Sequence, residues 1–125
     1  SGDFENVPES FEPIKTTDTP WPINLYAASK VVGETLARVY SSSYKLSCIC
    51  LRIGAVNSMD EKMDKFVPIS CTKNDIARLT ECCIRAPNTV KFDIFYGMSN
   101  NEYCWVDIDN AARVVGYIPE DKFRF

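Results

Sequence analysis

A tyrosine and a lysine stand four residues apart in the segment Tyr26-Ala27-Ala28-Ser29-Lys30. On a helix this spacing places both side chains on one face, one turn apart. A neighbouring ammonium lowers the pKa of a phenol from its ordinary value of about 10, so that the phenol can exchange protons near neutral pH. A redox enzyme needs such a group to protonate or deprotonate a substrate oxygen during hydride transfer. The pair therefore predicts acid–base chemistry on a hydroxyl or carbonyl group.

The chain has no glycine-rich phosphate loop to hold the dinucleotide cofactor that this chemistry requires. Its 125 residues are enough for one small domain or for a piece of a larger one. Hydrophobic residues make up 46% of the chain and aromatic residues 12%, which is sufficient for a packed core. We therefore expect a folded part of an enzyme whose N-terminal, nucleotide-binding half lies outside this chain.

Charge and hydropathy argue against nucleic acids and membranes as binding partners. The net charge of −3 and the absence of a basic cluster argue against nucleic-acid binding. No apolar run approaches the roughly 20 residues that span a bilayer, and the N-terminus has no signal pattern. We expect a soluble, cytoplasmic protein that binds neither nucleic acid nor a membrane.

The six cysteines favour a reducing compartment over a disulfide framework. Cys48 and Cys50 alternate within an apolar run, and Cys82 and Cys83 are adjacent on an expected helix, so these positions are typical of small buried hydrophobes. A metal site is not expected, because the chain has no histidine and no CxxC pair. A lone reactive thiol remains an alternative, at Cys71 or Cys104.

Periodicity and turn residues divide the chain into an irregular region, residues 1–24, and an alternating region, residues 25–125. The first region holds Pro8, Pro13, Pro20 and Pro22. The second contains, in order, a helix over 25–41, a buried strand over 46–53, a loop of roughly 16 residues, a helix ending near 85, a strand over 90–96 and a helix over 106–115. Asn24 is expected to cap the first helix and the serines at 41–43 to end it, whereas Thr72 or Asn74 caps the second. This order predicts an α/β fold with a mainly parallel sheet that needs further strands as neighbours.

Several motifs, in the right order, resemble the short-chain dehydrogenase/reductase superfamily. Residues 24–30, 33–34 and 50–54 are similar to the catalytic helix and following strand of its NAD-dependent epimerase/dehydratase branch. The later half is similar to uronate dehydrogenases in the helix containing Asp75 and at residues 85–87, 96–101, 105–107 and 116–121. The resemblance covers nearly all of the chain from about Pro20 and implies the C-terminal part of a Rossmann-like, doubly wound parallel sheet.

The resemblance also implies roles for individual residues. Tyr26 would be the general acid/base, and Lys30 would hold the ribose hydroxyls of NAD or NADP while acting on the tyrosine. Ile53 would lie near the nicotinamide. Most of the cofactor site would lie outside this chain, and the family's third catalytic residue, a serine or threonine, is not assigned.

The loop after Gly54 would contact the substrate, and here the chain departs from the uronate dehydrogenase pattern. A serine of the family is replaced by Ala55, and a carboxylate-binding arginine corresponds to Lys62 if the loop is two residues shorter. Because lysine cannot pair bidentately with a carboxylate, a less charged sugar is an alternative to a sugar acid.

Other residues have a structural and a functional interpretation. For Arg52 a salt bridge at the strand end is favoured over catalysis, and for residues 99–101 a turn is favoured over substrate contact. Trp21 and Trp105 are expected to pack, at a domain or subunit contact.

Together these features predict the C-terminal portion of an NAD(P)-dependent sugar oxidoreductase. Two alternatives stay open: a sugar epimerase or dehydratase, and a truncated, non-catalytic relative that serves as an interaction module. We expect a homodimer through the helix carrying Tyr26, or a completing N-terminal half. The isolated chain is expected to bind dinucleotide weakly and to be inactive.

Overall fold

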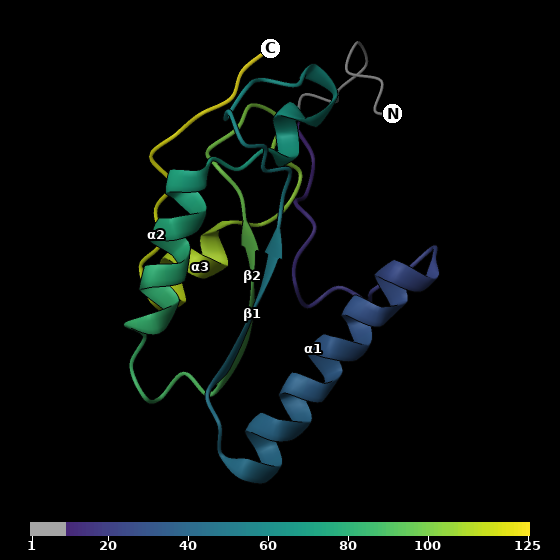
Figure 1. Cartoon of the computed structure of the whole chain (residues 1–125), viewed down its shortest axis with the longest axis vertical. Helices are drawn as coiled ribbons and strands as arrows, with labels where there is room; N and C mark the ends of the chain where they lie inside the picture. The colour runs from purple at the N-terminus through teal and green to yellow at the C-terminus, as the bar shows by residue number, and fades with distance from the viewer. Residues whose placement is uncertain (1–9) are drawn as a thin grey trace.

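The structure, a computed structural model, describes residues 10–125. Its elements, in chain order, are α1 (Leu25–Tyr44), β1 (Cys48–Ile53), the short 3-10 helix η1 (Asp64–Ile69), α2 (Lys73–Ile84), β2 (Phe92–Gly97) and α3 (Asp109–Val115) (Figure 1). β1 and β2 pair in parallel, with Cys48 opposite Phe92 and Ile53 opposite Gly97. The predicted alternation of helices and parallel strands is therefore confirmed, with two strands in the described part of the chain.

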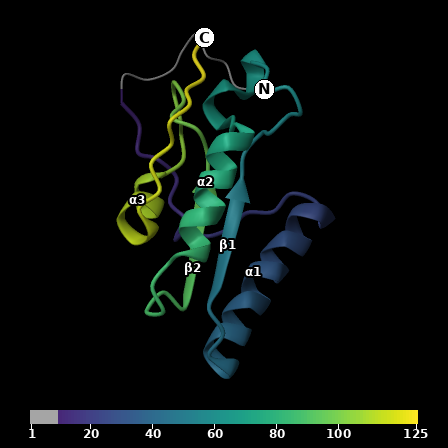
Figure 2. The same cartoon turned by 60° about the vertical axis from the view of Figure 1, so that its left-hand side comes forward.

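The helices cover both faces of this sheet. α1 lies on one face, and α2 and α3 lie on the other (Figures 1 and 2). Because side chains alternate along a strand, Ile49 and Leu51 face α2 and α3, while Arg52 faces α1. The core lies on the α2–α3 side, where the fully buried side chains are Leu79, Phe95, Ala111 and Tyr117.

The start of α1 follows the prediction, and its end does not. The side chain of Asn24 accepts a hydrogen bond of 2.8 Å from the amide of Ala27, as expected of a cap. The serines at 41–43 do not end the helix, which continues to Tyr44. Ser41 is buried and donates a hydrogen bond of 2.8 Å to the carbonyl of Lys91, and the helix ends where Lys45 adopts a left-handed φ of 57°. A tertiary contact thus outweighs the local preference of serine.

The N-terminal region explains a second shifted boundary. Ile14 forms an isolated parallel bridge with Val106, its amide donates to Trp105 O at 2.9 Å, and its carbonyl accepts from Asp107 N at 2.8 Å. This extended pairing keeps residues 106–108 out of α3, which begins at Asp109 instead of at 106.

Several apolar positions are less buried within residues 10–125 than their sequence pattern indicates. The outer side of α1 leaves Leu36, Val39 and Tyr40 about half exposed, at 52%, 49% and 51%. β1 is half-buried along most of its length and is not buried on both faces. The six cysteines are free thiols, and only Cys71 is buried. Trp21 is 87% exposed and does not pack within the described residues, so its expected place at a domain or subunit contact stays a prediction.

Residues 10–125 contain neither a membrane-spanning helix nor a metal-binding cluster. No helix there combines the length and apolar character needed to cross a membrane. No cluster of three or more histidine, cysteine, aspartate or glutamate side chains there is arranged to bind a metal ion.

Candidate functional site

An open cavity of about 550 Å³ lies between the first turns of α1 and the carboxyl end of β1. Three of the side chains that line it, Tyr26, Lys30 and Glu34, are spaced four residues apart and so share one face of the helix. Arg52 and Ile53 line it from the strand. Open α/β sheets bind their ligands outside the carboxyl ends of the parallel strands, so this cavity has the expected location for a ligand site.

The geometry of the tyrosine–lysine pair agrees with the sequence spacing. The Nζ atom of Lys30 lies 5.2 Å from the centre of the Tyr26 ring. Tyr26 is 73% exposed, so its hydroxyl is accessible from the cavity. Lys30 forms no ion pair with any residue between 10 and 125. An accessible phenol beside an ammonium that has no ion-pair partner among residues 10–125 is an arrangement that can exchange a proton with a substrate oxygen.

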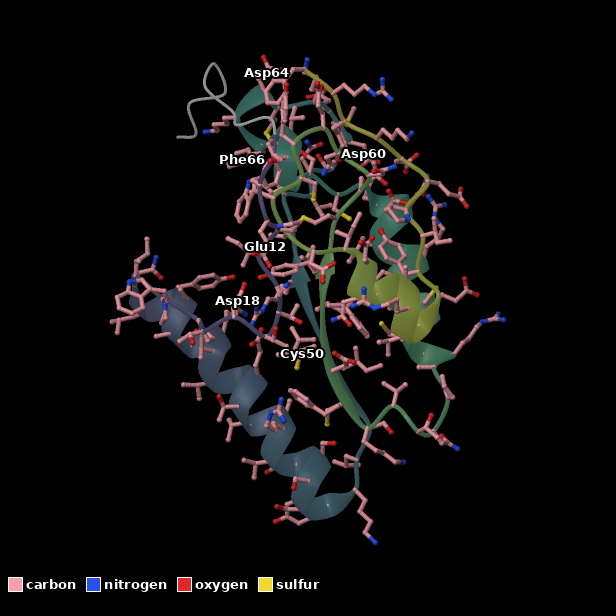
Figure 3. All side chains as sticks on the ribbon, turned by 180° about the vertical axis from the view of Figure 1, so that it is seen from behind. Glu12, Asp18, Cys50, Asp60, Asp64 and Phe66 are labelled. Carbon is pink, nitrogen blue, oxygen red and sulfur yellow. The ribbon has the colours of Figure 1, made fainter. Side chains whose placement is uncertain are left out.

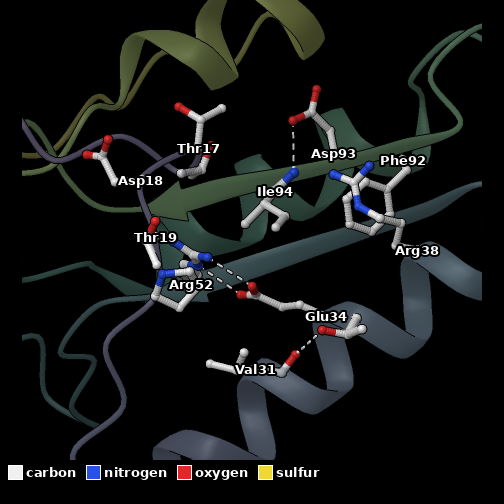
Figure 4. A pocket seen from close by; sticks show the side chains of 13 residues that line it. Thr17, Asp18, Thr19, Val31, Glu34, Arg38, Arg52, Phe92, Asp93 and Ile94 are labelled. Carbon is white, nitrogen blue, oxygen red and sulfur yellow. Dashed lines mark hydrogen bonds and ion pairs between the residues drawn. The ribbon is translucent and has the colours of Figure 1, made fainter.

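A bidentate ion pair between Arg52 and Glu34 forms part of the wall of this cavity and also lines the neighbouring pocket drawn in Figure 4. Arg52 donates from Nε to Glu34 Oε1 at 2.8 Å and from Nη2 to Glu34 Oε2 at 2.9 Å (Figure 4). Its third nitrogen, Nη1, donates to the hydroxyl of Tyr96 at 3.2 Å. The structural salt bridge predicted for Arg52 is thus confirmed, whereas its partners were not foreseen. The hydrogen bond from Arg52 to Glu34 is the main reason why the pKa of Arg52 lies above its usual value.

A thiol stands beside this pair, on the face of β1 that looks toward α1 (Figure 3). Partial burial, and secondarily the charge of Glu34, raises the pKa of Cys50. The cavity therefore favours the unreactive thiol form of Cys50, and this residue is not a candidate nucleophile.

The predicted cofactor and substrate residues are not all brought together. Ile53 lines the cavity with Tyr26 and Lys30. Ala55 lies one residue past Gly54, where its amide donates to Ile69 O at 2.7 Å and its carbonyl accepts from Cys71 N at 2.9 Å. Lys62 does not line the cavity; it pairs with Asp64 at 3.1 Å in the loop beyond the strand ends, where Figure 3 labels Asp64.

A second polar cluster, on the other face of the sheet, was missed by the sequence analysis. Asp75 is fully buried at the start of α2. Its carboxylate accepts hydrogen bonds from Ser99 Oγ at 2.6 Å and Arg78 Nη2 at 2.7 Å, and from the amides of Glu120 and Asp121 at 3.0 and 3.2 Å. The cluster ties the end of the loop, α2 and the C-terminal segment together. The one available signal was the Thr72-x-x-Asp75 spacing, which is typical of a helix start.

Residues 99–101 follow β2 in a turn, as predicted, and their side chains face inward. Ser99 is fully buried, and its hydroxyl donates to Asp75. Asn101 is 8% exposed and donates to the carbonyl of Ser70 at 2.7 Å. These contacts brace the loop rather than line the cavity.

Comparisons with known proteins also indicate an NAD-dependent enzyme family. Residues 2–122 match the model of the NAD dependent epimerase/dehydratase family. The NAD-dependent glucose-6-phosphate dehydrogenase of Haloferax volcanii is 32% identical over 125 aligned residues, which cover 94% of this chain and 47% of that protein. This chain thus spans about half the length of that curated relative.

Solved structures match the fold closely. Uronate dehydrogenase from Agrobacterium tumefaciens superposes with a TM-score of 0.80 at 26% identity, over 89% of this chain and 41% of that one. A variant of the same enzyme in complex with NAD superposes with a TM-score of 0.79 at 25% identity, over the same 89% and 41%. The predicted relationship to part of a Rossmann-like, uronate dehydrogenase-type fold is therefore confirmed.

Proposed function

Because the chain belongs to the NAD dependent epimerase/dehydratase family, we propose that it is the substrate-facing part of an NAD-dependent sugar oxidoreductase. The observation that carries this proposal is the common cavity of Tyr26 and Lys30 at the carboxyl end of β1. The names of the relatives add support, since they act on glucose 6-phosphate or on uronates.

The residues of the cavity fit the nicotinamide and ribose end of a dinucleotide. Lys30 offers an ammonium without an ion-pair partner in the described part of the chain, which suits hydrogen bonding to ribose hydroxyls. Ile53 is 54% exposed and offers an apolar wall for a flat ring. The chain has no glycine-rich turn for the pyrophosphate, so the proposed contacts are limited to that end of the cofactor. When bound, NAD supplies an acceptor for the hydride that leaves the sugar carbon.

In the proposed reaction, Tyr26 handles the proton. In its ionised form the Oη atom removes the proton of the substrate hydroxyl while the carbon loses its hydride, so that a C–OH group becomes a carbonyl. The ammonium of Lys30, 5.2 Å from the centre of the Tyr26 ring, supplies a positive charge beside the proton transfer. In the reverse direction, the tyrosine returns the proton to the carbonyl oxygen.

The substrate is proposed to be a sugar or a sugar acid. Lys62 could attract an anionic group only as a single ammonium, and it shares its charge with Asp64 in this conformation. Ala55 offers no hydroxyl for a substrate hydrogen bond. Both features favour a neutral aldose over a uronate.

The test is an assay of the natural protein with NAD against neutral aldoses, phosphorylated sugars and uronic acids. Net formation of NADH supports a dehydrogenase, whereas interconversion of sugars without net NADH identifies an epimerase. Tyr26→Phe should lower kcat by roughly 10²- to 10⁴-fold, because it removes the proton-transferring group. Tyr40→Phe is the matched control, since Tyr40 lies on the same helix outside the cavity. Equal activity of the two variants would refute the role of Tyr26.

The outer side of α1 suggests a homodimer as part of the same proposal. Large apolar side chains there are exposed, and contiguous apolar patches of this kind mark protein contacts. They are Leu25, Val32, Leu36, Val39, Tyr40 and Tyr44. Sedimentation analysis of Leu36→Glu against the wild type tests this: a monomeric variant supports the interface, and an unchanged mass argues against it.

A further inference from the structure

Glu34 and Lys30 have the spacing of a helical ion pair but do not form one. On a helix surface, oppositely charged side chains four residues apart ordinarily attract each other. Here both carboxylate oxygens of Glu34 accept hydrogen bonds from Arg52, on β1. Lys30 is left without an ion pair among residues 10–125, although it lines the same cavity.

We propose that Arg52 is a positioning residue that withdraws Glu34 from Lys30 and so keeps the lysine ammonium available to Tyr26 and to a bound cofactor. The catalytic meaning of this arrangement rests on the function proposed above. The arrangement itself is a property of the contacts and can be tested without activity.

The geometry suits an arginine at this position. The planar guanidinium pairs with both oxygens of one carboxylate at once, which a lysine cannot do. Its remaining Nη1 atom is held by Tyr96, which lies directly opposite Arg52 across the parallel strands. The side chains of Arg52 and Glu34 are only 24% and 19% exposed, so water competes weakly for this pair. Two hydrogen bonds therefore orient the carboxylate toward the strand, and a third holds the guanidinium that makes them.

Charge around the cavity leads to the same conclusion. Its charged lining residues are Lys30, Glu34 and Arg52. While Arg52 neutralises Glu34, Lys30 supplies an unbalanced positive charge beside the phenol. If Arg52 were neutral, Glu34 would lie one turn from both Lys30 and Arg38. Because the guanidinium of Arg38 stacks 4.3 Å over the ring of Phe92, the amine of Lys30 would be the partner free to pair with Glu34.

The test is the acylation rate of the Lys30 amine in the natural protein, measured by peptide mass spectrometry with limiting acetic anhydride at constant pH. An ion pair keeps an amine protonated and slows acylation. Arg52→Gln should therefore slow the labelling of Lys30 by roughly two- to fourfold. The double variant Arg52→Gln, Glu34→Gln should restore the wild-type rate, since the carboxylate is gone. Lys45, which follows α1 and forms no ion pair with any residue between 10 and 125, is the internal reference.

Two further variants separate positioning from structural support. Glu34→Gln alone should leave Lys30 as reactive as in the wild type, and Arg52→Lys should give an intermediate rate. If Arg52 acts only as structural support, the double variant will behave like Arg52→Gln or worse. The proposal would be overturned if the Arg52→Gln variant unfolds with the same transition as the wild type and its Lys30 is acylated at the wild-type rate.

Activity is the second readout, and it distinguishes the two proposals. Arg52→Gln should lower kcat with NAD, and the double variant should recover most of that loss. Restored labelling without recovered activity would leave the positioning of Lys30 intact and count against the proposed catalytic function. Recovered activity without a change in labelling would count against the positioning role.

Discussion

The hydroxyl of Ser99, which follows β2, donates a hydrogen bond of 2.6 Å to the fully buried carboxylate of Asp75, at the start of α2. The same hydroxyl accepts a hydrogen bond of 3.1 Å from the amide of Thr72, so one side chain connects the end of the loop with the helix that follows it. Asp75 in turn accepts from the amides of Glu120 and Asp121, which belong to the C-terminal segment. The loop that begins at the proposed site is thus anchored at its far end by a buried polar cluster.

Replacing Asp75 by asparagine should therefore lower the free energy of unfolding by about 3 kcal/mol. The change keeps the shape of the side chain but removes the charge that holds Arg78 and weakens bonds to two backbone amides. Urea denaturation followed by circular dichroism measures the effect. Glu61→Gln is the control, because Glu61 is exposed and only its backbone is hydrogen-bonded, and it should change stability by less than about 0.5 kcal/mol. Equal stabilities would show that the cluster contributes nothing as a charged unit.

Gly54 is the second position with a sharp structural requirement. A Cβ atom added there would collide with the carbonyl oxygen of Ile69 and would lie 2.5 Å from Sδ of Met98. The methionine can move, but the carbonyl of Ile69 is fixed by its hydrogen bond from Ala55 N. Gly54→Ala should cost about 2 kcal/mol or more in the free energy of unfolding.

Gly33 provides the opposite result for the same substitution. It lies inside α1, and a Cβ there would have no heavy atom within 4 Å. Since alanine favours a helix over glycine by about 1 kcal/mol, Gly33→Ala should stabilise the protein. Comparing the thermal unfolding midpoints of Gly54→Ala and Gly33→Ala with that of the wild type tests both predictions. A stabilised Gly54→Ala would contradict the close approach of the loop to the end of β1.

Local patterns predicted much of this molecule, and long-range pairing explains what they missed. The shared face of Tyr26 and Lys30 follows from helix periodicity alone, as does the cap at Asn24. The predicted end of α1 was wrong because the hydroxyl of Ser41 donates a hydrogen bond to the carbonyl of Lys91, fifty residues away in the chain. No local rule connects those two positions.

The two polar clusters show the same limit. A salt bridge for Arg52 was predicted from the cost of burying an unpaired charge, yet its partners Glu34 and Tyr96 are 18 and 44 residues away. The partners of Asp75 come from three separate segments, one of them 46 residues distant. Such partners are determined by the topology of the chain, and the sequence patterns predicted only the fold class.

Cys71 should be the least reactive of the six thiols. It is 2% exposed, and burial, followed by the charge of Asp75, raises its pKa to about 12. At pH 8 only about one thiol in ten thousand would then be ionised, and the thiolate is the reactive form. Iodoacetamide labelling of the native protein at pH 8, read by peptide mass spectrometry, should modify the half-buried cysteines before Cys71. In urea all six should react at similar rates. Early labelling of native Cys71 would mean that the loop end opens readily.

Tyr117 makes the stability of the fold depend on alkaline pH. Its side chain is 1% exposed, and its hydroxyl donates to the carbonyl of Met98 at 2.8 Å. Burial, and then the charge of Asp75, raises the pKa of Tyr117 above its ordinary value of 10.0. The phenol therefore stays neutral in the folded protein while it ionises in the unfolded chain. Its contribution to stability is fully present below pH 10 and is lost as the pH rises further, by about 1.4 kcal/mol per pH unit.

Comparison with Tyr117→Phe isolates this effect, because the raised pKa values of the cysteine thiols are common to both proteins. At pH 9 the variant should be less stable by about 1 kcal/mol, since it lacks the hydrogen bond to Met98. At pH 11 that difference should vanish or reverse, because phenylalanine cannot ionise in the unfolded chain. Urea denaturation at both pH values under reducing conditions measures the two differences, with Tyr40→Phe as an exposed control. A difference that stays constant between pH 9 and pH 11 would show that Tyr117 ionises equally in the folded and unfolded states.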